Sequence, residues 1–165
     1  MTDRHWFIVE THSRKERLAR QNLERQGYPV LSPMVRKKKR RRGKWQTVDE
    51  IMFPGYVFIE LFIGIDDLAP IRSTIGCKGL VKFGPHPQSV PEPIIRPFVV
   101  LGDNPVEVKD ELCSGDRVRF ETGPLEGLEG IFNFSKGRER AEVLIALLGR
   151  QATVIAELTE LSKSS

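Results

Sequence analysis

The sequence predicts an α+β protein with an N-terminal domain over residues 1–101 and a small C-terminal domain over residues 112–165. Three observations support this fold class. Short apolar strand candidates alternate with helical segments through the first hundred residues. Residues 102–111 form a polar stretch around Asn104 and Pro105, which is typical of a linker. Residues 115–132 contain the glycines and alternating apolar side chains of two paired strands.

The first elements are a strand at residues 5–10 and a helix that runs to about Gln26. Ser13 and Glu16 have the spacing of a capping box, which predicts the start of the helix. Gly27 is its predicted stop. Residues 28–35 return as a strand interrupted by two prolines, so we expect it to be bulged or to lie at a sheet edge.

The strongest strand signal covers residues 52–61. Side chains alternate across a strand, so Val57, Ile59 and Leu61 share one face while Tyr56 and Phe58 share the other. If helices cover the aliphatic face, the aromatic outer face marks a binding site or a surface covered by another domain. The alternative is a sheet with helices on both faces.

Three further elements complete the N-terminal domain. They are a short helix at residues 66–72, a strand at 79–83 and a helix at 90–100. Two prolines fit the first turn of the last helix. A third, Pro97, predicts a kink because proline inside a helix costs about 3 kcal/mol.

Charge is distributed unevenly along the chain. The net charge of +4 combines +8 over residues 1–100 with −4 over residues 101–165. Residues 36–44 contain eight basic side chains in nine positions, and such a run is expected in an exposed loop or at a hairpin tip. We interpret it as a phosphate-binding segment, the alternative being a solvated loop. The predicted nucleic-acid contacts in this run are Lys37, Lys38, Lys39, Arg40, Arg41, Arg42 and Lys44.

The C-terminal domain allows two interpretations. Val118 and Phe120 alternate with charged residues before a Gly-Pro turn, which is typical of a small SH3-like barrel that docks partners. Further on, strand periodicity groups Ala141 with Val143 and Ile145, whereas helical periodicity groups Ala141 with Leu144, Ile145 and Leu148. The sequence supports both a strand and a helix here.

Enzymatic function is not expected. The three histidines are scattered without metal-ligand spacing, and no serine, cysteine or threonine lies in a nucleophile motif. We therefore predict no metal and no cofactor. No apolar run reaches the roughly 18 residues needed to span a membrane, and the N-terminus has no signal segment, so we expect a cytoplasmic protein.

Several segments in order resemble the NusG family of transcription elongation factors. They are Trp6 with its strand, residues 22–26, the sequence Phe-Pro-Gly-Tyr-Val-Phe at 53–58, and residues 71–76, 80–84 and 90–91. Residues 115–132 resemble the KOW motif of the same family. Residues 42–44, Glu50, Phe132 and Arg140 are most similar to the operon-specific RfaH type.

This resemblance implies an NGN-type antiparallel sheet with helices, followed by a KOW domain. It implies a monomeric elongation and antitermination factor that binds RNA polymerase at the β′ clamp helices and the β gate loop, contacts DNA of the transcription bubble and suppresses pausing. Its KOW domain would recruit Rho or a small-subunit ribosomal protein. The implied polymerase-binding residues are Phe53, Pro54, Tyr56, Phe58, Phe83, Ile95 and Phe98.

The resemblance also implies that the KOW domain is either a barrel or an α-helical hairpin packed on the N-terminal domain. The interdomain residues would be Glu50, Phe132, Arg140, Leu144 and Leu148, with a charge pair between Glu50 and Arg140. The DNA-reading stretch of the RfaH type is replaced here by residues 67–69, leaving Arg14, Arg72 and Lys78 as candidate DNA contacts. The alternative function is a KOW-containing RNA-binding or ribosome-associated protein, for which the basic run would be the main site.

Overall fold

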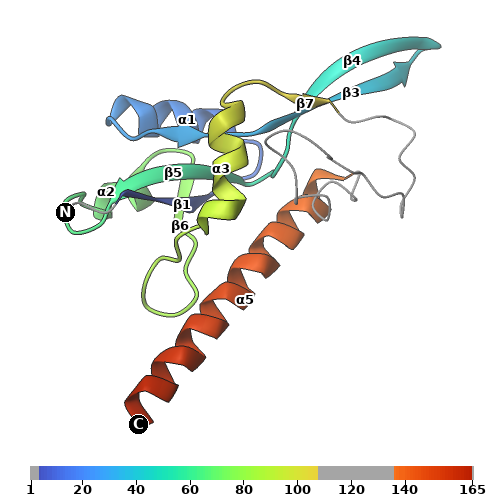
Figure 1. The fold of residues 1–165 in the computed structure, drawn as a ribbon. Coiled ribbons are helices and arrows are strands. Elements are labelled where there is room, and N and C mark those ends of the chain that lie inside the picture. Colours follow the sequence, from blue (N-terminus) through green and yellow to red (C-terminus); the bar gives the residue numbers. More distant parts are fainter. Residues whose placement is uncertain (1–3, 108–135, 165) are drawn as a thin grey trace.

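The computed structural model describes residues 4–107 and 136–164, with side chains of the last helix up to Arg150. Its main sheet has the strand order β2-β5-β1-β6, and every neighbouring pair is antiparallel (Figure 1). The strands are β1 (Arg4–Thr11), β2 (Val30–Leu31), β5 (Tyr56–Phe62) and β6 (Cys77–Leu80). The predicted α+β class and antiparallel sheet are confirmed, and β2 is an edge strand as its prolines indicated.

The two faces of β5 separate as its alternation predicted. Val57 and Ile59 pack with Leu61 on one face, beneath α1 (Glu16–Arg25) and α2 (Ala69–Ser73). Phe58 belongs to the core on the opposite face. The strand begins at Tyr56, four residues later than predicted, because a turn through Gly55 at φ 87° precedes it.

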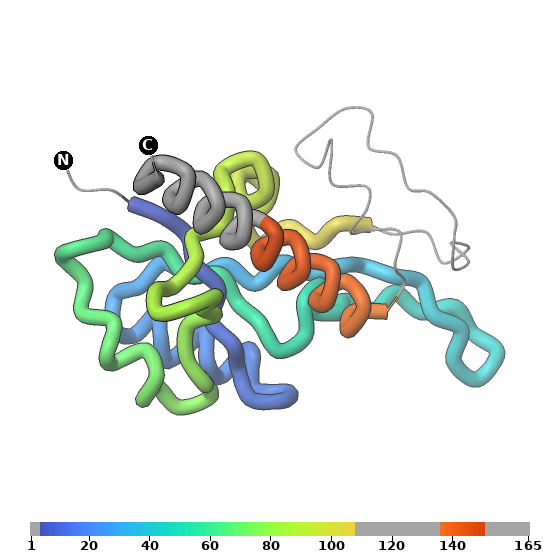
Figure 2. Tube along the Cα trace, turned by 90° about the horizontal axis from the view of Figure 1, so that it is seen from below, coloured from blue at the N-terminus to red at the C-terminus, as the bar shows by residue number. Residues whose placement is uncertain are grey.

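The opposite face of the sheet is covered by α3 (Glu92–Leu101) and α5 (Gly137–Ser164), which lie beside each other in Figures 1 and 2. Helices therefore lie on both faces, but α5 belongs to the predicted C-terminal domain, so this face also fits the expectation of a surface covered by another domain. The tail is helical from Gly137 onward in this structure, in agreement with its helical periodicity. The core of this face consists of Ile8, Val35, Met52, Phe53, Phe58, Val90, Ile95, Phe98, Val106, Ala141, Leu144 and Leu148.

A second sheet has the order β4-β3-β7. Strands β3 (Met34–Arg41) and β4 (Lys44–Ile51) form a long hairpin that extends away from the main sheet (Figure 1). The basic run predicted as a loop or hairpin tip occupies β3 and the turn of this hairpin. Strand β7 (Val106–Glu107) pairs in parallel with β3, within the segment interpreted as a linker.

One local expectation is wrong. Ser13 does not cap α1, which starts at Glu16 with no side-chain cap. Instead the buried Glu16 carboxylate accepts a 2.9 Å hydrogen bond from the backbone N–H of Gly55, so tertiary contact replaces the capping box. Pro97, where a kink was predicted, is buried within α3, and the helix continues past it to Leu101.

Candidate functional site

Three phenylalanine rings form the centre of the sheet face beneath α3 and α5. The centroid of Phe53 lies 6.0 Å from that of Phe58 and 5.8 Å from that of Phe98, both edge to face. Phe58 and Phe98 stack at 5.7 Å. Each such pair adds about 0.5–1.5 kcal/mol beyond area burial. The rings therefore form an ordered apolar surface rather than a loose cluster.

Local sequence explains how these rings meet. Phe58 points to this face because β5 alternates, and Phe53 immediately precedes the turn that starts β5. Phe98 comes from the buried side of α3, one turn after Ile95. Three separate elements thus supply one surface.

Helix α5 packs on this surface. Leu144 and Leu148, four residues apart on one side of the helix, have no exposed area, and Ala141 is also buried. Gly137 lies against the ring of Pro54, and Gly149 lies against the ring of Phe83. The residues that the resemblance assigns to polymerase binding all line or flank the surface beneath α5: Phe53, Pro54, Tyr56, Phe58, Phe83, Ile95 and Phe98.

Arg140 anchors the start of α5. Its side chain is 1% exposed, and its Nε donates a 3.0 Å hydrogen bond to the carbonyl oxygen of Met52. Burial lowers the pKa of Arg140, an effect that the nearby carboxylate of Glu50 partly offsets. Removing a cation from water is costly, and this cost offsets much of the energy of its hydrogen bond. We therefore expect Arg140 to contribute mainly to the position of the start of α5 and little to the free energy of docking.

The charge of Glu50 acts on Arg140 as predicted, but the ion pairs that its carboxylate forms are with two lysines. Glu50 forms ion pairs with Lys37, at 3.3 Å, and with Lys39. Burial raises the pKa of Glu50, but the hydrogen bond from Lys39 and the charge of Lys37 outweigh it, so its pKa lies below the ordinary value. The hairpin register explains why Glu50 pairs with these lysines. Glu50 lies opposite Val35 of β3, and Lys37 and Lys39 are two and four residues further along β3, on the same face.

The basic residues of the hairpin differ in their surroundings. Arg36 forms a two-bond ion pair with Asp49, which balances its charge, whereas Lys37 and Lys39 share the single carboxylate of Glu50. The other cations of the run have no acidic partner within the described part of the chain, and all but Lys38 lie closer to the tip than the paired ones: Lys38, Arg40, Arg41, Arg42 and Lys44. This end of the hairpin is the strongest candidate phosphate-binding surface of the described residues.

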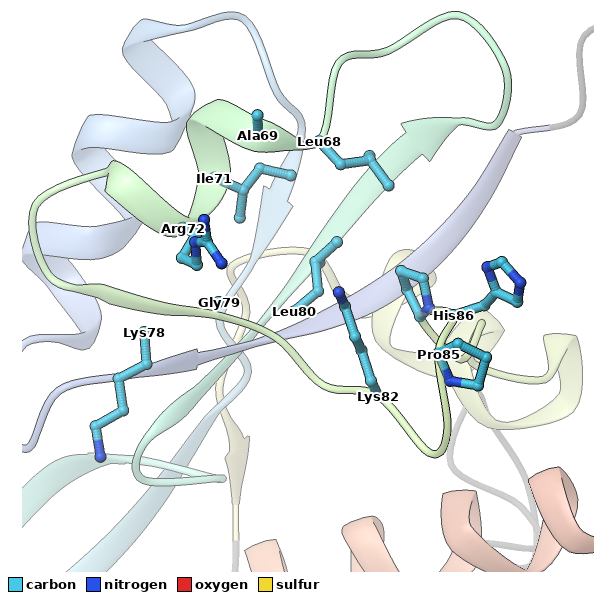
Figure 3. Close-up of a pocket in the computed structure, with 11 residues that line it drawn as sticks. Leu68, Ala69, Ile71, Arg72, Lys78, Gly79, Leu80, Lys82, Pro85 and His86 are labelled. Carbon is cyan, nitrogen blue, oxygen red and sulfur yellow. The ribbon is translucent and has the colours of Figure 1, made fainter.

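A cavity of about 580 Å³ lies between α2 and β6 (Figure 3). Arg72, Lys78, Lys82 and His86 surround it, with Leu68 and Leu80 among its apolar lining. It brings together two candidate DNA contacts, Arg72 and Lys78, that are six residues apart in sequence. Lys78 also reaches Glu10 on β1 at 3.7 Å, a weak ion pair.

Arg14, the third candidate in this region, occupies the exposed turn before α1 at a φ of 61°. A hydrogen bond of 2.9 Å from the N–H of His12 to the carbonyl oxygen of Gly76 joins this turn to the one before β6. Phe132 lies outside the described residues. Sequence reasoning missed Met52 as the acceptor for Arg140, because a backbone carbonyl leaves no signal in a sequence.

Among the side chains that the structure describes, in residues 4–107 and 136–150, no group has the arrangement of a metal site. Among the same residues, no helix is sufficiently long and apolar to cross a membrane.

Comparisons with known proteins place the chain among one group of relatives. The family model described as transcription termination factor nusG matches residues 4–112. The transcription termination/antitermination proteins NusG of Staphylococcus aureus strains Mu50 and N315 are each 27% identical over 173 residues, covering 96% of this chain and 94% of the relative. A solved structure on domain interaction in Thermotoga maritima NusG is 27% identical and covers 75% of this chain and 76% of that chain, with a TM-score of 0.47.

Proposed function

Because the chain belongs to the NusG family of non-enzymatic transcription factors, we propose that it is an elongation and antitermination factor that binds RNA polymerase through the surface beneath α5. One observation carries this proposal: the surface of Phe53, Phe58 and Phe98 already accommodates an amphipathic helix, α5. Grooves that take one amphipathic helix are suited to another. The β′ clamp helices are therefore the proposed occupant.

The same geometry supports regulation by the tail. Leu144 and Leu148 occupy the surface that a polymerase helix would need, so the two cannot bind together. Polymerase binding then requires α5 to leave, as the RfaH type implies. Its released C-terminal domain would be available to recruit Rho or a small-subunit ribosomal protein.

Nucleic acid is proposed to bind on two basic surfaces beside the polymerase contact. The hairpin tip supplies phosphate contacts, and the cavity between α2 and β6 adds Arg72 and Lys78. A protein that holds polymerase and bubble DNA together adds binding free energy to the elongating state. It thereby shifts the enzyme away from paused states to which it binds less well.

A retention assay on immobilised core polymerase tests the proposal. Leu148→Asp places a charge in the buried docking surface and should release α5, raising retention above that of the wild type. Adding Tyr56→Ala or Phe83→Ala to this variant should abolish the gain. Adding Ile65→Ala, a matched change at an exposed loop residue, should not. Equal retention of the Tyr56, Phe83 and Ile65 variants would refute the proposed surface.

A further inference from the structure

The tip of the β3–β4 hairpin carries one large aromatic side chain. Trp45 is 64% exposed and belongs to neither core. It makes no ring stacking or cation contact within the described part of the chain. Its partner in the strand register is Arg40. An indole left open to water beside a cation does not serve the packing of this fold.

The charges around Trp45 follow the hairpin register. Residues opposite each other in an antiparallel pair lie on the same face, as do residues two apart. Trp45 and Arg40 therefore share a face with Lys38 and Thr47. Both acidic residues that face the basic strand, Asp49 and Glu50, are paired nearer the base, so the positive charge beside Trp45 remains uncompensated.

The turn holds this arrangement in place. Only Arg42 and Gly43 connect the strands, with φ values of 51° and 76°. Two positive φ angles are typical of the type I′ turn, whose twist matches that of the strands. Residues other than glycine rarely adopt such a φ. The sequence nevertheless has an arginine at this position, which puts a basic side chain at the apex of the turn. Trp45 thus lies in β4, separated by Lys44 from a two-residue cationic turn.

We propose that Trp45 stacks on an unpaired base of single-stranded DNA while Arg40, Lys38 and the cations of the turn bind its phosphates. Aromatic side chains bind nucleotides by stacking on the faces of the bases, and basic residues follow the backbone. In a duplex those faces are covered by neighbouring base pairs, so the tip distinguishes open DNA from closed DNA. The choice of DNA rests on the proposed function, which brings the protein to the open strands of a transcription bubble.

Fluorescence anisotropy with the full-length chain tests this inference. The probes are a labelled DNA strand of about 16 nucleotides, the blunt duplex of the same sequence and the matching RNA strand. The wild type should bind the DNA strand more tightly than the duplex. Trp45→Leu should weaken binding to the strand by about tenfold and leave duplex binding unchanged, whereas Trp45→Phe should retain most of the affinity.

A charge variant provides the matched control. Arg41→Gln should weaken strand and duplex alike and reduce the dependence of both affinities on salt, because it removes a phosphate contact only. If Trp45→Leu behaves like Arg41→Gln, Trp45 supports the hairpin and does not stack. Unchanged strand affinity in Trp45→Leu would also overturn the inference, and tighter binding of the RNA strand would overturn the choice of DNA.

Emission from the indole gives a readout that does not depend on hairpin stability. The chain has two tryptophans, so Trp6→Phe leaves Trp45 as the sole reporter. Saturating single-stranded DNA should quench and shift its emission, and the duplex should not. Because no polymerase is present, loss of this signal refutes the stacking inference alone, whereas failure of the retention assay refutes only the polymerase surface.

Discussion

Two glycines of α5 should respond in opposite ways to the same substitution. A Cβ at Gly149 would meet the ring of Phe83 at 3.4 Å, which is ordinary contact with a side chain that is 36% exposed. A Cβ at Gly137 would lie 2.7 Å from Cγ and 2.8 Å from Cδ of Pro54, closer than such atoms approach. Gly149→Ala fits the docked helix, and Gly137→Ala does not.

The magnitudes follow from these positions. Within a helix, alanine is about 1 kcal/mol more favourable than glycine, so Gly149→Ala should stabilise the docked helix by about that amount. This changes the ratio of docked to released helix by about fivefold. Gly137 is the first residue of α5, where helix propensity matters little, and forcing a methyl group against Pro54 should cost about 1–3 kcal/mol.

Hydrogen exchange of α5 amides in the full-length chain measures the docked fraction, and retention on core polymerase measures the released one. Gly149→Ala should slow exchange and weaken retention, and Gly137→Ala should do the reverse. Ala146→Gly serves as a control at an exposed position of the same helix, where only propensity changes. Faster exchange in Gly149→Ala, or a shift of both variants in the same direction, would refute the reasoning.

Three further outcomes are expected. Leu144→Ala empties a fully buried site and should destabilise α5 docking by about 2–5 kcal/mol, seen as faster exchange and higher polymerase retention, whereas Leu18→Ala at an exposed site should change neither. Glu16→Ala should lower the free energy of unfolding by about 1–3 kcal/mol in urea titration, because it leaves the Gly55 N–H without its acceptor, and Glu16→Gln should recover much of this loss. The pKa of Glu50 is lower in the folded state than its unfolded value of 4.5. Its ion pairs should therefore add their full free energy of unfolding above pH 4.5 and lose it as the pH falls through the folded pKa. In Glu50→Gln, acid unfolding should lack this pH-dependent loss of stability.

The sheet could be predicted because its signal is local. Alternation within β5 placed Val57 and Phe58 on opposite faces, and the register with β1 confirms that division. The basic run was predicted only as a loop or tip, since eight like charges repel. Its strand form depends on Asp49 and Glu50, which come into register only when the hairpin closes.

The secondary structure of the tail could not be predicted from its own residues. Ala141 and Ile145 fit both the strand and the helical period, and intrinsic propensities differ by too little to select one. What favours the helix here is a surface formed by residues far earlier in the chain, since Leu144 is buried in the same core as Phe53 and Phe58. Similarly, the predicted capping box does not form because the Glu16 carboxylate accepts its hydrogen bond from the backbone N–H of Gly55 and not from a backbone N–H at the start of α1.

Under the proposed function, tail docking and polymerase binding are quantitatively linked. One face of the sheet is covered by α1 and α2, while on the other face Phe53 and Phe58 share one core with Phe98 of α3 and with Leu144 and Leu148 of α5. If α5 and the polymerase compete for that place, the apparent affinity for polymerase equals the intrinsic affinity multiplied by the released fraction. While the helix is mostly docked, any substitution in α5 that strengthens docking must weaken polymerase binding by the same factor. A plot of the two free-energy changes over Gly149→Ala, Gly137→Ala, Leu144→Ala and Ala146→Gly should therefore be a line of slope −1, and points scattered off that line would show that α5 and polymerase use different surfaces.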